Sequence, residues 1–140
     1  MTDTMMIKRH VAGRTFSVQV QAKCDPETGE RTVSARSAQS AELAIASALA
    51  LEGPVTGEAF RYLRGVLGLS AVTLAGLFGV RPETVSRWER DTVPVSRSAW
   101  VALGALVLER AGRPPATMAR LEHLSLGKPA RKRVTIHLAA

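Results

Sequence analysis

The fold of this chain is decided by residues 67–90, which read LGLSAVTLAGLFGVRPETVSRWER. Ser70 is a residue type that commonly caps a helix, and the apolar spacing after it predicts a short helix over residues 71–78. Gly79 then predicts a sharp turn. Pro82 suits the first position of a following helix, because the N–H that proline lacks would have no helical partner there. The stretch therefore predicts two short helices joined by a tight turn.

Two further helical patterns frame this pair of helices. One covers residues 57–67 after a capping signal at Thr56, and the other opens at Ser96 after the loop of residues 93–95. The side chains predicted to face the core are Phe60, Leu63, Leu67, Leu74, Ala75, Phe78, Val85, Trp88, Trp100, Leu103 and Val107. This order of short helices is typical of a helix-turn-helix, and a generic four-helix domain is the alternative.

The first 36 residues predict a small sheet. Residues 15–23 alternate between apolar and polar side chains, which places Phe16, Val18 and Val20 on one face. The turn-forming residues 25–30 follow, and residues 31–35 are a candidate return strand. Residues 5–11 are a further candidate strand. A lone hairpin is marginal in water, so this sheet should pack against a helix or a partner chain.

Ser37 is predicted to cap a helix over residues 38–51, which Gly53 and Pro54 end. The predicted fold class is therefore α+β, with a small N-terminal hairpin or sheet and one helix, followed by an all-α helix-turn-helix domain. The expected divisions are residues 1–53 as an interaction or dimerisation segment, 54–126 as a DNA-binding domain, and 127–140 as a basic tail with a possible strand.

The charge balance favours an acidic partner, and nucleic acid is the usual one. The chain of 140 residues has 19 Lys and Arg against 12 Asp and Glu, a net charge of +7. Most of the basic residues are arginine, as in proteins from GC-rich genomes, which weakens this signal. Residues 54–92 are nearly neutral, and the largest excess lies in residues 114–140. The basic run 127–133 either contacts phosphates or is a solvated tail. Residues 134–138 could extend the N-terminal sheet or that of a partner chain, or could be a disordered end.

Several functional classes are excluded by the residues present. Cys24 is the single cysteine, which excludes an intramolecular disulfide and a zinc site of paired cysteines. The three histidines are scattered, and neither a phosphate-binding GK[ST] motif nor a GxSxG motif occurs. No signal peptide is visible, and the most apolar stretch, residues 101–108, is too short to span a bilayer. We therefore expect a cytoplasmic protein that is not an enzyme and has no cofactor, metal or membrane contact.

Three segments closely resemble the Xre/Cro family of helix-turn-helix DNA-binding proteins: LGLS at 67–70, LAxxFGV at 74–80 and PETVSRWER at 82–90. The resemblance covers residues 56–108 and implies a lambda-repressor-like domain. The preceding TGExFRYLR at 56–64 is similar to MqsA-type antitoxins, which also place a β-rich segment before their DNA-binding domain. Those proteins usually bind zinc there through paired cysteines, and Cys24 lacks such partners.

The resemblance implies that residues 82–90 lie in the major groove with Pro82, Glu83 and Arg87 at the base edges. Arg87 can donate two hydrogen bonds to guanine, which makes it the best specificity residue. Glu83 either accepts from a cytosine amino group or compensates the helix dipole.

The remaining residues of the implied interface flank this helix. Thr84 and Ser86 are candidates for phosphate or neighbouring contacts, and Arg81 occupies a cap position from which it can reach a phosphate. Thr92 and Arg97 are further phosphate candidates after the helix. Relatives often have Gln where this chain has Ala71, so one ordinary contact is lost. Arg64 and Glu89 match a pair that forms a structural salt bridge in the family.

The resulting hypothesis is a dimeric repressor that reads a palindromic operator in double-stranded DNA. The fourth helix and residues 116–124 could supply the dimer contact, or simply complete the core. The MqsA-like pattern further implies an antitoxin that represses its own operon and binds a toxin through residues 1–53. The alternatives are a stand-alone phage or mobile-element regulator and a protein-interaction module that no longer binds DNA.

Overall fold

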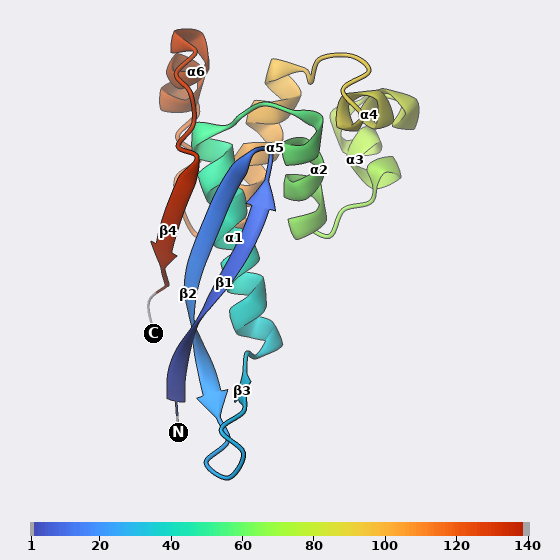
Figure 1. Cartoon of the computed structure of the whole chain (residues 1–140). Coiled ribbons are helices and arrows are strands. Elements are labelled where there is room, and N and C mark those ends of the chain that lie inside the picture. Colours follow the sequence, from blue (N-terminus) through green and yellow to red (C-terminus); the bar gives the residue numbers. More distant parts are fainter. Residues whose placement is uncertain (1, 139–140) are drawn as a thin grey trace.

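The computed structural model describes residues 2–138, which form an α+β fold with a sheet and six helices (Figure 1). The strands are β1 (Thr2–Val11), β2 (Arg14–Cys24), β3 (Arg31–Thr32) and β4 (Arg133–His137). The helices are α1 (Ala35–Glu52), α2 (Gly57–Val66), α3 (Ala71–Phe78), α4 (Pro82–Glu89), α5 (Arg97–Arg110) and α6 (Thr117–Leu126).

Strand β2 lies at the centre of the sheet. It pairs antiparallel with β1 on one side, through a tight turn at Ala12 and Gly13. Both turn residues have positive φ, 52° and 76°, as a two-residue hairpin turn of type I′ requires. On its other side β2 pairs antiparallel with β3 and parallel with β4. The sequence left several alternatives open for residues 134–138, among them a strand in this sheet and a strand in the sheet of a partner. The structure shows that they extend this chain's own sheet.

The sheet has one buried face, as the alternation in β2 predicts. Phe16, Val18 and Val20 are buried and belong to one hydrophobic core with Ile45 and Leu49 of α1. Helix α1 runs along this face of the hairpin (Figure 1). The same core continues into α2, α3, α4 and α5, so the sheet and the helices share a single apolar interior.

The predicted start of α1 was wrong. Ser34, not Ser37, is the N-cap: its backbone is extended, and its hydroxyl accepts a hydrogen bond from the N–H of Ser37 at 3.1 Å. The return strand is also shorter than the predicted residues 31–35, because only Arg31 and Thr32 pair with β2. The chain leaves the sheet after this pairing, and the first serine beyond it becomes the cap.

The other predicted caps and core positions are confirmed. The hydroxyls of Thr56, Ser70 and Ser96 accept hydrogen bonds from the N–H groups three residues later, at 3.2, 3.0 and 3.3 Å. The expected core side chains are buried except Phe78, which is half-buried at the edge of the core.

Helix α6 is joined to the body by a buried arginine that the sequence did not suggest. Arg120 is 3% exposed and donates hydrogen bonds to the carbonyl oxygens of Ala50 and Val101, at 3.0 and 2.9 Å. Gly104 of α5 makes room for it, because a Cβ at this position would overlap the guanidinium. Burial lowers the pKa of Arg120 from its ordinary value. The guanidinium thus fixes α6 beside α1 and α5, and it supplies a donor to the Ala50 carbonyl, which lies in the last turn of α1 where carbonyls lack a helical partner.

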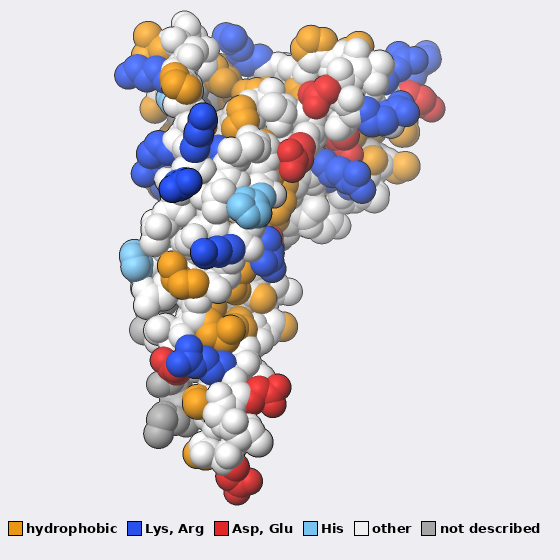
Figure 2. Space-filling view, in the orientation of Figure 1, with side chains coloured by type: hydrophobic (Ala, Val, Ile, Leu, Met, Phe, Trp, Pro, Cys, Tyr) orange, Lys and Arg blue, Asp and Glu red, His pale blue; other side chains and the backbone are white. Residues whose placement is uncertain are grey.

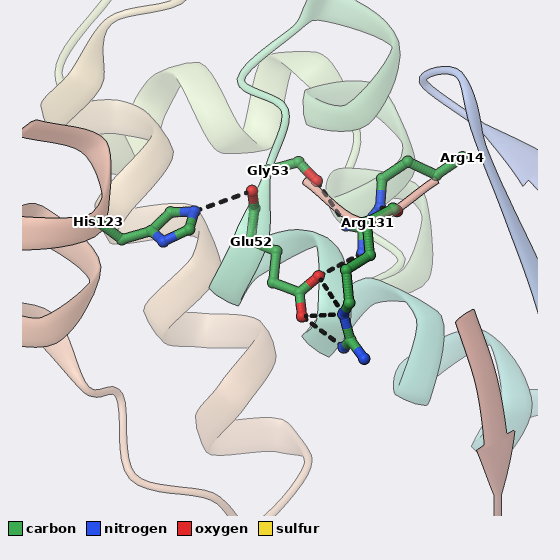
Figure 3. Close-up of polar contacts among 5 residues, drawn as sticks. All are labelled: Arg14, Glu52, Gly53, His123 and Arg131. Atoms are coloured by element: carbon green, nitrogen blue, oxygen red, sulfur yellow. Dashed lines mark hydrogen bonds and ion pairs between the residues drawn. The ribbon is translucent and has the colours of Figure 1, made fainter. Parts of the chain in front are cut away.

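A second buried arginine joins β2, the end of α1 and the segment before β4 (Figure 3). Arg14 is 2% exposed and donates to Glu52 Oε2 and the Gly53 carbonyl at 2.6 Å, and to the Arg131 carbonyl at 2.7 Å. The Arg131 side chain reaches the other oxygen of Glu52, with Nε–Oε1 at 3.0 Å. Nε2 of His123 in α6 lies 3.3 Å from the Glu52 carbonyl. This junction holds β4 beside β2.

The charged partners set the pKa of Glu52. Burial alone would raise it, but the hydrogen bonds and positive charges of Arg131 and Arg14 outweigh burial, so the pKa lies below its usual value. A carboxylate with a lowered pKa in the folded state stabilises the fold above its unfolded-state pKa. That contribution is lost as the pH falls through the folded-state pKa.

We therefore expect Glu52→Gln to remove a pH-dependent part of the stability. In urea unfolding, the wild type should lose stability more steeply than Glu52→Gln as the pH falls below about 4.3, the ordinary glutamate pKa. At neutral pH the variant should be about 1–3 kcal/mol less stable. Glu122→Gln, at an exposed carboxylate of α6, is the control. Parallel pH profiles for wild type and Glu52→Gln would contradict this account of the junction.

Candidate nucleic-acid interface

The turn between α3 and α4 sets the direction of α4. Gly79 ends α3 in the left-handed conformation, with φ 67° and ψ 30°, and Val80 donates its N–H to the Ala75 carbonyl at 3.0 Å. Arg81 is then extended, and Pro82 begins α4. A left-handed residue at this position favours glycine. The sharp turn predicted from Gly79 is confirmed.

The inner face of α4 is fixed to the core. Val85 is fully buried and Trp88 nearly so. The ring of Trp88 meets that of Phe60 in α2 edge to face, with centroids 5.6 Å apart and an interplanar angle of 65°. These contacts determine the rotation of α4 about its axis, and therefore which of its side chains face outward.

The structure brings Arg64 and Glu89 together in a two-pronged ion pair. Nε and Nη2 of Arg64 lie 2.6 and 2.8 Å from the Glu89 oxygens, and Nη1 donates to the Leu69 carbonyl at 3.0 Å. The hydrogen bonds to Glu89 raise the pKa of Arg64. Only 17% of the Arg64 side chain and 10% of that of Glu89 are exposed, so the pair serves the fold by joining α2 to the end of α4.

A close backbone approach also joins these two helices, and the sequence did not reveal it. Gly57, the first residue of α2, donates its N–H to Asp91 Oδ1 at 2.9 Å, just beyond α4. A Cβ at Gly57 would overlap the Trp88 carbonyl and lie 2.5 Å from the Glu89 carbonyl oxygen. Glycine is therefore required here by packing rather than by backbone conformation. Gly57 belongs to the TGE pattern of residues 56–58, but the need for glycine at this position comes from the contact between α2 and α4.

The outward side of α4 carries most of the expected interface residues. Arg81, Pro82, Glu83 and Arg87 are exposed, whereas Thr84 and Ser86 are half-buried. Glu83 and Arg87 are one turn apart and share a face. Side chains of both charges gather over the α3–α4 lobe (Figure 2).

Arg90 extends this face and was missed in the sequence. It is exposed, follows Arg87 by three residues, and its Nε lies 3.4 Å from the Ser86 carbonyl oxygen. The spacing of Glu83, Arg87 and Arg90 was the available signal, because residues four and three apart align on one side of a helix.

The two flanking candidates lie at the far end of α4. Thr92 and Arg97 are exposed in the connection to α5 and at its start. Arg97 lines a hollow together with Asp91 and Leu124. The expected interface therefore divides into a row along α4 and a separate pair beside the C-terminal end of this helix.

On α3, the exposed side chains include two large apolar ones and the hydroxyl of Thr73. Val72 and Leu77 are exposed, and Ala71 at the start of the helix is half-buried. The exposed charged side chains of this lobe lie on α4 and its flanks, because α3 contains no charged residue.

The structure brings no metal ligands together at this site. Among residues 2–138, no three His, Cys, Asp or Glu side chains group closely enough to hold a metal ion. No helix in this part of the chain is long and apolar enough to cross a membrane. The chain matches no family model, no curated protein and no solved structure.

We expect Gly57→Ala to destabilise the protein, because the new methyl group meets backbone atoms of α4 that cannot rotate away. Overpacking of this kind costs about 1–3 kcal/mol. Gly65→Ala, also in α2 but with no atom within 4 Å of the added Cβ apart from its chain neighbours and its own helix backbone, should instead stabilise by about 0.5–1 kcal/mol. Urea unfolding of both variants checks the opposite signs. Equal effects would show that the contact between α2 and α4 is not tight.

Proposed function

We propose that α3 and α4 form a helix-turn-helix and that the protein is a sequence-specific transcriptional repressor, with α4 reading an operator in the major groove. This proposal rests on an exposed row of side chains: Glu83 and Arg87 on α4, and Arg90 at its C-cap. The opposite face of α4 is fixed by Val85 and Trp88. A positioned helix with free polar side chains is what direct reading of base edges requires.

The roles of the side chains follow from their positions. Arg87 donates to the O6 and N7 atoms of guanine, and Glu83 accepts from a cytosine amino group. Arg81, exposed and making no side-chain cap hydrogen bond, contacts a phosphate at the start of α4. Thr92 and Arg97 contact phosphates beyond the other end of α4. Thr84 and Ser86 are half-buried, so they contribute contacts beside those of Glu83 and Arg87 rather than direct hydrogen bonds to base edges.

The repressor acts as a homodimer on a palindromic site, because two copies place two recognition helices on successive turns of the groove. Exposed apolar side chains on α5 and α6 support a dimer contact there: Leu106, Met118, Leu121 and Leu126. Met118 and Leu126 are the most exposed of these, at 69% and 68%.

We further propose that the protein is the antitoxin of a toxin–antitoxin pair and binds its toxin through residues 1–53. The far end of the β1–β2 hairpin, with β3, extends away from the α3–α4 lobe (Figure 1). A partner on this end of the hairpin would leave α4 free to contact DNA. This arrangement supports a protein that binds its toxin and its operator at the same time.

Arg87→Ala tests the reading of DNA by α4. We expect the variant to bind DNA from upstream of its own gene about five- to 150-fold more weakly, because one two-pronged contact to a base contributes about 1–3 kcal/mol of discrimination. Arg36→Ala, which removes an exposed arginine at the start of α1, is the matched control. Fluorescence anisotropy at several salt concentrations measures both variants.

Two results would contradict the proposal. If the wild type shows no salt-sensitive, sequence-specific binding to this region, the protein is not such a repressor. If Arg87→Ala binds as well as Arg36→Ala, α4 is not the reading helix.

The antitoxin role predicts a small neighbouring gene whose product is toxic. Expression of that gene alone should stop growth, and co-expression of this chain should restore it. Met6→Glu, at an exposed apolar side chain of β1, should restore growth less well if the toxin binds residues 1–53. A neighbouring gene that is harmless when expressed alone would favour a stand-alone regulator.

A further inference from the structure

Strand β4 forms an open edge of the sheet. Its parallel pairing with β2 runs from Arg133 opposite Thr15 to His137 opposite Gln19. Thr15 donates its N–H to the Lys132 carbonyl at 2.7 Å, and Leu138 donates to the Gln19 carbonyl at 3.3 Å. In a parallel ladder alternate residues of a strand bond to the same neighbour. The backbone groups of Arg133, Thr135 and His137 therefore point away from β2, and β4 has no second neighbour within residues 2–138.

An apolar groove lies directly beside this edge. It is a hollow of about 650 Å³ between α1 and β4. Its apolar lining includes Leu43, Ala44, Ala48 and Leu51 of α1 with Ile136 and Leu138 of the C-terminal segment. Ile136 is opposite Val18 and shares the sheet face that α1 covers. An added strand would place every second side chain on this same face, and thus in the groove.

The combination of a free backbone edge and an adjoining apolar groove is the recognition mode of a strand added to a sheet. Main-chain hydrogen bonds supply affinity, and pockets for alternate side chains supply specificity. The edge is preformed, because Arg14 and Glu52 hold the segment at Arg131 in place. Binding therefore needs to order only the incoming segment.

The charges around the edge identify the kind of segment. Arg113 and Arg131 line the groove, and Lys132 and Arg133 lie at the start of β4. Residues 127–138 contain no Asp or Glu, and Glu52 is already shared by Arg14 and Arg131. Basic side chains gather around the start of β4 (Figure 2). A second β4 would bring the same unneutralised positive charge, whereas an acidic strand would complement it.

We propose that the outer edge of β4 and the adjoining groove of α1 bind an extended, acidic segment of a partner protein as a further strand of the sheet. Alternate apolar side chains of this segment enter the groove, and its carboxylates, on the opposite face of the added strand, lie beside Arg133 and within the positive field of Arg113 and Lys132. The site is distinct from the outward face of α4, and the proposal does not depend on DNA binding.

The test uses the full chain and two synthetic probe peptides of about eight residues, the length of a typical strand. One peptide alternates valine with glutamate, and the other alternates valine with lysine. In fluorescence anisotropy the glutamate peptide should bind at least about tenfold more tightly than the lysine peptide, with the difference shrinking in high salt.

Position 135 offers a matched pair of variants. Thr135→Pro removes a backbone N–H that points away from β2, so it blocks the added strand while keeping the ladder to β2. Thr135→Val keeps this N–H. The proline variant should bind the glutamate peptide at least about tenfold more weakly than the valine variant. Ala48 lines the groove from α1, and glutamate is well tolerated in a helix. Ala48→Glu should therefore weaken binding of the glutamate peptide without altering β4.

The proposal is overturned if the glutamate peptide does not bind, or if it binds Thr135→Pro and Ala48→Glu as well as the wild type. It is also overturned if the wild type is a dimer that Thr135→Pro alone dissociates, because a second copy would then occupy the edge. DNA binding measured in parallel should be unchanged in Thr135→Pro, which separates this site from the function proposed for α4.

Discussion

The guanidinium of Arg14 bonds to three separate parts of the chain at once: the side chain at the end of α1, the turn after it, and the backbone that leads into β4. Arg14 is 2% exposed, so its charge would be left without compensation in the interior if the Glu52 carboxylate were removed. An exposed pair such as that of Arg131 with Glu52 contributes about 1 kcal/mol or less. Arg14 is therefore the group that decides where the C-terminal strand lies relative to α1 and the hairpin.

A second set of contacts positions α4 and depends on packing against α2. The Phe60–Trp88 ring contact, the Arg64–Glu89 ion pair and the approach of Gly57 to the end of α4 all act on the same two helices. Together they leave one side of α4 facing outward. The two sets are separate: one presents a row of polar side chains on α4, and the other presents the edge of β4. A protein built in this way can engage two partners on different surfaces.

The local features of the fold were predictable because neighbouring residues create them. The caps at Thr56, Ser70 and Ser96 depend on the three residues that follow each of them, and the buried face of β2 depends on strict alternation. The cap of α1 was not predictable, because Ser34 and Ser37 both suit this role and the end of the β3 pairing chooses between them. Part of the row on α4 was readable from helical spacing, although Arg90 was overlooked.

By itself, the sequence determined the order of the elements, the turn at Gly79, and which side of each amphipathic segment is apolar, since short-range spacing encodes these properties. Only the tertiary structure decided that Arg14 and Arg120 are buried, that Gly57 and Gly104 must lack side chains, and that β4 lies parallel to β2 with an open edge. Each of these depends on residues that are far apart in the chain, such as Arg14 and Arg131, or Arg120 and Ala50. No local sequence pattern predicts such a contact, because the contact forms only when packing of the elements brings distant parts of the chain together.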